Sequence, residues 1–356
     1  MYYMSKVSLI MPVYNAQHCL QKSVESVLRQ THTDFELIIV ESCSKDNSAA
    51  MCDEFARSDS RIKVFHEDKA CGPATARNKA LELVNGEYIM FIDCDDRIEQ
   101  TMISSMLSEI ENSDCDVVIS GYYQDFLDSD DNYIYSVEVD PPVIFADNHK
   151  DCVAAVPILD AAKVLAVSWN KIYKADIIKN NGVKFADLMH SEDYFFIIDL
   201  FKYINTVKTV QSKYYHYMKY QRTSLTNKPY LQGFTQLIND RFISQRELLK
   251  SVGAYSGKPR ELMCAVHIKH VFSAIVNECG TASGLTAAER RETVKSLLYH
   301  INTVEAKRYT ANISKMQTVM NTVVKSGSPF AAGVTGRLIW LIQHKAPALF
   351  NKMKIK

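Results

Sequence analysis

The chain has 356 residues, with 41 basic and 41 acidic residues and 47% hydrophobic residues. This length can bury a large core and more than one structural unit, while the apolar runs are too short to cross a bilayer. The first residues lack the apolar stretch of a signal peptide, and nine scattered cysteines without a CxxC pair argue against a disulfide framework or a zinc site. We therefore expect a cytoplasmic enzyme with reduced thiols.

The first hundred residues alternate between strand and helix patterns. Strands are expected over residues 6–11, 35–40, 62–65 and 88–92. Apolar residues at helical spacing predict a helix over residues 19–30, and a second helix is expected over residues 74–84 after a turn at Gly72 and Pro73. This alternation predicts a mostly parallel α/β sheet with helices on both faces.

Three aspartates follow the fourth expected strand. Asp93, Asp95 and Asp96 come where the buried run of residues 88–92 ends, at the sheet edge where open α/β sheets bind ligands. Clustered carboxylates repel one another unless a cation offsets them, and hard oxygen ligands suit Mg²⁺ or Mn²⁺. Such an ion commonly also binds substrate phosphates. The alternative from the residues alone is an Asp-rich turn that caps the next helix.

The second part of the chain is dominated by helical patterns. Residues 229–326 contain several amphipathic stretches separated by Gly- and Pro-containing breaks. We therefore expect a catalytic domain over residues 1–228 and a helical region over residues 229–356. His267 and His270 lie one helical turn apart, but without a third ligand they do not predict a metal site.

Charge is distributed unevenly along the chain. Residues 306–356 contain nine Lys or Arg and no acidic residue, so the remainder holds 32 basic and 41 acidic residues. Within this tail, apolar and basic residues are interleaved over residues 330–356. Such a segment can lie on an anionic membrane surface, which would make the enzyme peripheral on the inner face of the cell membrane. The alternative is a C-terminal helix that packs on the acidic body.

Several motifs then occur in an order that is typical of one enzyme family. They are PVYN (12–15), RQTHTDFELIIVES (29–42), ATARNKAL (74–81), DCDD (93–96), SWNKIY (168–173), SEDYFF (191–196) and YHYMKYQRTSLT (215–226). Together they resemble the inverting family 2 glycosyltransferases of the GT-A fold, of the bacterial surface-polysaccharide type. The resemblance implies transfer of a sugar from a nucleotide-diphospho-sugar to a hydroxyl of a glycan acceptor, which would be lipid-linked.

The resemblance also implies a set of donor-binding residues. They are Pro12, Tyr14, Glu41, Ser42, Arg77, Asp93 and Arg222. Tyr14 would lie against the nucleobase, and Arg222 would lie on a loop that closes over the diphosphate. Ser42 stands where the family commonly has a second carboxylate that contacts a pyrimidine, and its hydroxyl would bind a base more weakly. A UDP-sugar is still the expected donor.

The resemblance also implies a metal site at the three aspartates. Asp95 is the expected first ligand of Mn²⁺ or Mg²⁺, and Asp96 is either a second ligand or a partner behind it. Arg77 would pair with Asp95 or the diphosphate, or would orient the aspartates. Asp93 would approach the ribose or the metal.

The SEDYFF segment carries the expected catalytic base. By the resemblance, Asp193 removes the proton of the acceptor hydroxyl, and Glu192 holds the acceptor or caps its helix. The alternative is a plain helix start in which Ser191 caps the first turn. Trp169 would form an aromatic floor for the acceptor or would belong to the core.

Two other functions were weighed against a glycosyltransferase. A nucleotidyltransferase would usually have a Gly-rich phosphate loop after the first strand, and PVYNAQ is not one. A catalytically inactive scaffold of a polysaccharide assembly complex is suggested by the departure at Ser42. The presence of Asp93, Asp95 and Asp193 argues against it.

Overall fold

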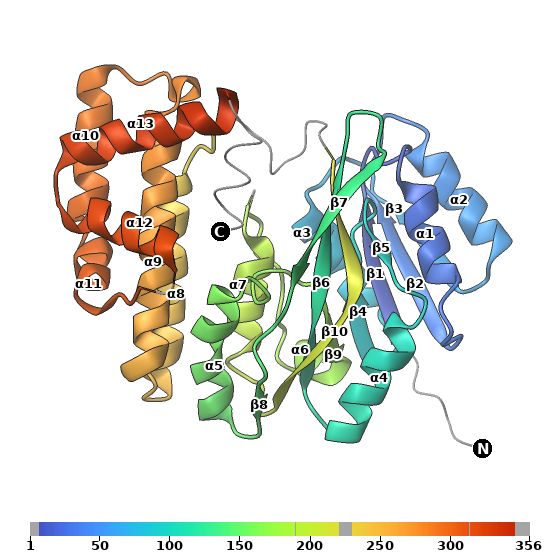
Figure 1. The fold of residues 1–356 in the computed structure, drawn as a ribbon. Coiled ribbons are helices and arrows are strands. Elements are labelled where there is room, and N and C mark those ends of the chain that lie inside the picture. The colour runs from blue at the N-terminus through green and yellow to red at the C-terminus, as the bar shows by residue number, and fades with distance from the viewer. Residues whose placement is uncertain (1–6, 189, 221–229, 313, 346–356) are drawn as a thin grey trace. The chain divides into compact units, whose positions relative to one another are not determined.

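The computed structural model describes residues 7–188, 190–220, 230–312 and 314–345 (Figure 1). The chain forms two compact units, Met1–Arg222 and Thr223–Lys356. The division falls within residues 221–229, which lie outside the described ranges. The domain boundary expected after residue 228 therefore stays a prediction.

The N-terminal half of the sheet has the predicted parallel strands. They are β1 (Val7–Val13), β2 (Phe35–Glu41), β3 (Ile62–His66) and β4 (Tyr88–Phe91), in the spatial order β3-β2-β1-β4. Every residue of β2 is buried, as expected of a strand covered on both faces. In the register of the β1–β2 pair, Pro12 lies beside Val40 and Val13 beside Glu41. The ends of β1 and β2 therefore meet at one edge of the sheet.

The second half makes the sheet mixed. β9 (Lys171–Lys174) pairs antiparallel with β4 and with β6 (Val117–Leu127), and β10 (Val207–Lys219) runs parallel to β6. β5 (Arg97–Ile98) closes the order antiparallel to β10. The hairpin strand β7 (Tyr133–Val139) pairs with β6, and β8 (Phe145–Ala146) pairs with β10. This arrangement places β9 beside β4, the strand that ends in the aspartates.

Helices cover this sheet on both sides, as predicted. They are α1 (Leu20–Leu28), α2 (Ser48–Ser58), α3 (Pro73–Leu83), α4 (Met102–Ser113), α5 (His149–Ala161), α6 (Ala175–Asn180) and α7 (Glu192–Leu200). α1 and α2 lie on one face and α3 lies on the other (Figure 1). Pro73 occupies the first turn of α3, where its missing N–H costs nothing, and Arg77 lies on the buried side of that helix.

The C-terminal unit is helical in its described ranges. It contains α8 (Phe234–Ser251), α9 (Gly257–Cys279), α10 (Ala287–Tyr299), α11 (Ile301–Tyr309), α12 (Lys315–Lys325) and α13 (Pro329–Lys345), with a 3-10 turn at Thr281–Ser283. α9 is the central helix, because most of its side chains are buried. α10 begins with a capping box between Thr286 and Glu289. None of the helices within the described residues is long and apolar enough to cross a membrane.

Candidate active site

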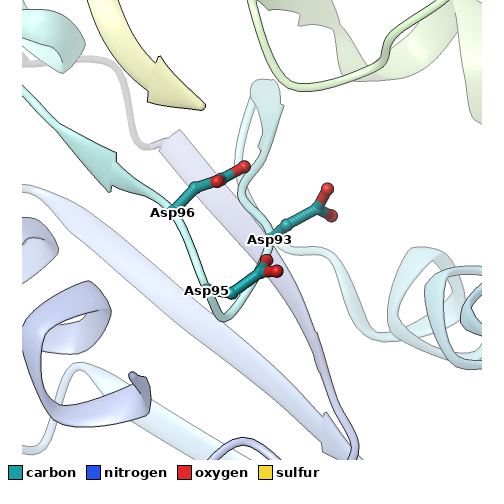
Figure 2. A group of neighbouring side chains, drawn as sticks. All are labelled: Asp93, Asp95 and Asp96. Carbon is teal, nitrogen blue, oxygen red and sulfur yellow. The ribbon is translucent and has the colours of Figure 1, made fainter. Parts of the chain in front are cut away.

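The three predicted aspartates lie together on the turn that follows β4 (Figure 2). Asp93, Asp95 and Asp96 can each place one carboxylate oxygen within 4.8 Å of the others. The turn is closed by the Asp96 N–H, which donates to the Asp93 carbonyl at 3.1 Å. This oxygen-only donor set matches the ligands that Mg²⁺ and Mn²⁺ prefer, so the three residues fit a divalent ion.

Asp96 is the buried anchor of this turn. Its carboxylate accepts a hydrogen bond from the Tyr215 hydroxyl at 2.7 Å and another from the Met218 N–H at 2.8 Å. The Tyr215 oxygen in turn accepts from the Asp93 N–H at 3.1 Å. Burial and the neighbouring charge of Asp95 raise the pKa of Asp96 well above its usual value. Of the two roles expected for Asp96, these contacts fit the partner that holds the turn to β10.

Asp95 carries a destabilised charge. Burial and then the charge of Asp93 raise the pKa of Asp95 to about 6. A carboxylate in this position is stabilised as an anion when a cation binds beside it. The electrostatics of the site therefore favour a bound cation at Asp95.

Arg77 joins the aspartate turn to the start of α7. Its side chain is 4% exposed, and its guanidinium lies 2.6 Å from Asp93, 3.2 Å from Glu192 and 3.3 Å from Asp193. Burial alone would lower the pKa of Arg77, but the charges of these three carboxylates raise it instead. No ion pair between Arg77 and Asp95 is found among the described residues. Of the roles expected for Arg77, its ion pair with Asp93 fits the one that orients the aspartates, and contact with the diphosphate stays a prediction.

Asp193 begins α7 beside Arg77 in a buried environment. Burial raises the pKa of Asp193, while the charge of Arg77 acts in the opposite direction. Ser191 precedes the helix with φ of 64° and makes no side-chain capping bond. Ser191 therefore does not act as a cap, but Glu192 and Asp193 still lie in the first turn, where acidic residues are favoured, so the catalytic role of Asp193 stays a prediction.

The SWNKIY segment lies in the core beneath α7. Trp169 is 3% exposed, stacks on Tyr215 at 4.1 Å between ring centroids and meets the edge of Tyr122 at 4.8 Å. Both contacts cover the indole, so they agree with the core alternative. Its contact with an acceptor sugar stays a prediction.

Lys171 holds the loop before β9 from within. Its ammonium is fully buried and donates to the Val164 carbonyl at 2.8 Å, the Leu165 carbonyl at 3.1 Å, the Asn170 side chain at 2.7 Å and the Val167 carbonyl. Burial lowers the pKa of Lys171 to about 7, and the charge of Asp193 acts against this. The loop that carries Ser168 is therefore tied down beside Asp193.

The residues expected at the nucleobase lie at the ends of β1 and β2. Tyr14 follows β1 and is 46% exposed, so its ring is open to a ligand. Pro12 lies in β1 and is partly buried. Arg222 lies outside the described residues, and its role stays a prediction.

Glu41 and Ser42 are both engaged within the protein. The Glu41 carboxylate accepts from the Ser44 N–H at 2.6 Å and lies 3.1 Å from the His66 ring. The Ser42 hydroxyl donates to the Cys71 carbonyl at 3.0 Å. In the arrangement described, Glu41 shapes the loop after β2, and Ser42 ties that loop to the segment before α3.

Comparison with solved structures identifies the fold. The chain resembles the crystal structure of S. aureus TarS 1-349 in complex with UDP-GlcNAc, with a TM-score of 0.62, 16% identity, and coverage of 96% of this chain and 91% of that one. It also resembles a mannosyltransferase from Pyrobaculum calidifontis in complex with GDP-Man and Mn²⁺, with a TM-score of 0.51, 12% identity, and coverage of 94% and 88%. The protein therefore has the GT-A fold of nucleotide-diphospho-sugar transferases.

Sequence comparison finds a family match over part of the chain. Residues 8–162 match the model of glycosyl transferase family 2. Glycosyltransferase GlyG of Streptococcus pneumoniae is 37% identical over 131 residues, which are 37% of this chain and 43% of that protein. Putative glycosyltransferase EpsH of Bacillus subtilis is 33% identical over 214 residues, 59% of this chain and 60% of that protein. The matches thus span about half the length of these relatives. Residues 8–162, which are less than half of the chain, are therefore similar to glycosyl transferase family 2.

Proposed function

We propose that the protein is an inverting hexosyl- or N-acetylhexosaminyltransferase of surface-polysaccharide synthesis. It moves a sugar from a nucleotide-diphospho-sugar, with UDP as the expected nucleotide, to a hydroxyl of a lipid-linked glycan acceptor. The observation that carries the proposal is Arg77, which joins the donor-side Asp93 to the acidic pair Glu192 and Asp193. A single buried cation therefore links the two sets of residues that a transfer reaction must bring together.

Asp193 is the proposed base. It accepts the proton of the acceptor hydroxyl while the nucleotide diphosphate leaves from the opposite face of the sugar, which inverts the anomeric configuration. Its Oδ1 atom lies 3.3 Å from Arg77. Arg77 keeps the buried carboxyl ionised and therefore able to accept a proton, because its charge opposes the effect of burial.

Asp93 and Asp95 are the proposed ligands of Mn²⁺ or Mg²⁺. When bound, the ion would offset the charge of the diphosphate and of the departing nucleotide. Asp96 acts behind them by holding the turn to Tyr215 and Met218. A mannosyltransferase of similar fold is described in complex with GDP-Man and Mn²⁺, which supports a metal of this kind.

Donor recognition is proposed at the ends of β1 and β2. Tyr14 stacks on the base, and Pro12 shapes the floor of the same site. A UDP-sugar donor is supported by the similar fold described in complex with UDP-GlcNAc. Residues 330–356 would bring the enzyme to the membrane that displays a lipid-linked acceptor.

The test is turnover of a nucleotide-sugar panel with Mn²⁺, comparing wild type with Asp193→Asn. The matched control is Asp199→Asn on the same helix, where the aspartate is 36% exposed and pairs with Lys202. We expect one donor to be turned over, with a loss on the order of 10²–10⁴ in Asp193→Asn and little change in the control. Donor binding, measured by calorimetry, should survive in both variants.

Full turnover by Asp193→Asn would exclude Asp193 as the base. Failure of the wild type to bind any donor would favour the inactive scaffold instead. The internal bonds of Glu41 and Ser42 give that second function a specific basis, since neither side chain presents an unengaged group to a base. The match of residues 8–162 to glycosyl transferase family 2 does not support the nucleotidyltransferase interpretation.

A further inference from the structure

The last described helix of the C-terminal unit is apolar on two opposite sides. One side of α13 faces the core of the helical unit, where Ala332, Gly336 and Trp340 are buried. A Cβ at Gly336 would lie 2.9 Å from the Ile275 side chain, so α13 and α9 approach closely at this point. Figure 1 shows α13 crossing α9. The inward side of α13 therefore accounts for only part of its apolar residues.

The other side of α13 presents large apolar side chains to solvent. Its members follow helical spacing and are Phe330 (73% exposed), Val334 (55%), Leu338 (55%) and Leu341 (37%). At 100° per residue these positions fall within an arc of about 80°, on the side opposite the buried residues. We call these four residues the outer stripe. A helix that exposes such a row normally covers it with another surface.

The charges around the outer stripe indicate what covers it. Lys345 lies at the end of the stripe and is exposed, and Lys352, Lys354 and Lys356 follow it in the sequence. The whole segment 306–356 has nine basic residues and no acidic one. An apolar row next to uniformly positive charge matches the interface of a bilayer with anionic headgroups, where apolar side chains insert and lysines remain at the headgroups.

We infer that the outer stripe of α13 is a membrane-binding face that lays the C-terminal unit on an anionic bilayer. Among the described residues no helix is long and apolar enough to cross a membrane, so the inference concerns a helix that lies on the bilayer surface. This deepens the proposed function, because a lipid-linked acceptor is the reason for an enzyme to lie there. The binding itself requires neither donor nor acceptor.

The test is co-sedimentation of the full chain with vesicles of mixed phosphatidylcholine and phosphatidylglycerol, and with vesicles of phosphatidylcholine alone. Wild type should bind the anionic vesicles, bind neutral ones more weakly, and be released as salt is raised. The double variant Phe330→Ser/Leu338→Ser should lower the partition into anionic vesicles by about tenfold or more, because two apolar side chains no longer insert. Lys345→Gln should give a smaller loss that disappears at high salt.

Matched controls separate the stripe from exposed apolar surface in general. Ile301→Ser, at a position 76% exposed on α11, and Val319→Ser, at a position 53% exposed on α12, should bind vesicles like wild type. Circular dichroism checks that each variant folds, and turnover of soluble donor should be unchanged in all of them. If wild type binds anionic vesicles but turns over no donor, the proposed function fails and the membrane-binding inference stands.

Three results would overturn the inference. Wild type that fails to bind anionic vesicles would do so directly, as would stripe variants that bind as well as wild type. The third is a wild-type dimer in light scattering that becomes a monomer in Phe330→Ser/Leu338→Ser without any vesicle binding. That result would assign the stripe to contact between two copies of the chain.

Discussion

Replacement of Arg77 by Met tests how much this cation stabilises the catalytic unit against the repulsion of three neighbouring carboxylates. Arg77 is 4% exposed and forms ion pairs with Asp93, Glu192 and Asp193, whose side chains are 26%, 15% and 15% exposed. Met has a similar length and no charge, so the variant leaves three partly buried carboxylates close together without their cation. Breaking a buried ion pair on one side costs about 3–5 kcal/mol, and we expect a loss of unfolding free energy in this range.

The assay is urea unfolding at neutral pH, with Arg29→Met as the matched control. Arg29 is 64% exposed and pairs with Glu25 on a helix surface, so its loss should cost about 0–1 kcal/mol. Arg77→Lys should recover part of the stability, because an ammonium restores the charge but cannot reach both sides of the site as the guanidinium fork does.

The pH dependence gives this prediction a second readout. Protonation removes a charge that Arg77→Met leaves unpaired, so the difference between variant and wild type should shrink as the pH falls and Asp193, whose pKa burial raises to about 6, becomes protonated. A loss below about 1 kcal/mol at neutral pH would refute the reasoning, because it would mean that the carboxylates are stabilised without Arg77. A loss that stays constant with pH would assign the effect to packing instead of charge.

Two further predictions concern the metal site and the C-terminal unit. Mn²⁺ should raise the melting temperature of wild type but have little effect on Asp95→Asn, measured by differential scanning calorimetry; an equal rise in both would exclude Asp95 as a ligand. In the C-terminal unit, His267 is buried against Phe242, and burial lowers its pKa to about 3 from the usual 6.5. Because the folded state holds the ring neutral, stability should fall as the pH drops below about 6.5, by up to about 1.4 kcal/mol per pH unit, and His267→Phe should flatten this slope in urea unfolding between about pH 7.5 and about pH 5. Equal slopes in variant and wild type would contradict it.

Local patterns predicted the parts of the fold that depend on neighbouring residues. The apolar runs that became β1, β2, β3 and β4 are short and bounded by turns, and their alternation with helices predicts a parallel order. The antiparallel insertion of β9 between β4 and β6 was not predicted, because strand pairing between residues 88–90 and 172–174 depends on a contact distant in sequence. Likewise, the sequence shows only that apolar and basic residues are interleaved over residues 330–356, whereas the structure divides the apolar residues of α13 between a buried side and the outer stripe.

The candidate site follows the same division between local and distant information. The aspartates were predicted because a strand end and carboxylates occur within one short motif. The carboxylate partners of Arg77 were not predicted, because they come from two segments that lie 16 and about 115 residues away in sequence. This arrangement also has a chemical consequence. Arg77 holds Asp93 and the acidic pair with one guanidinium, so a donor or cation that draws Asp93 away from it would leave more of its charge to Glu192 and Asp193. Since a nearby cation lowers a carboxyl pKa, the proposed base would then be more fully ionised when the donor is bound. The structural link between the two motifs is therefore also a route by which donor binding can prepare the base.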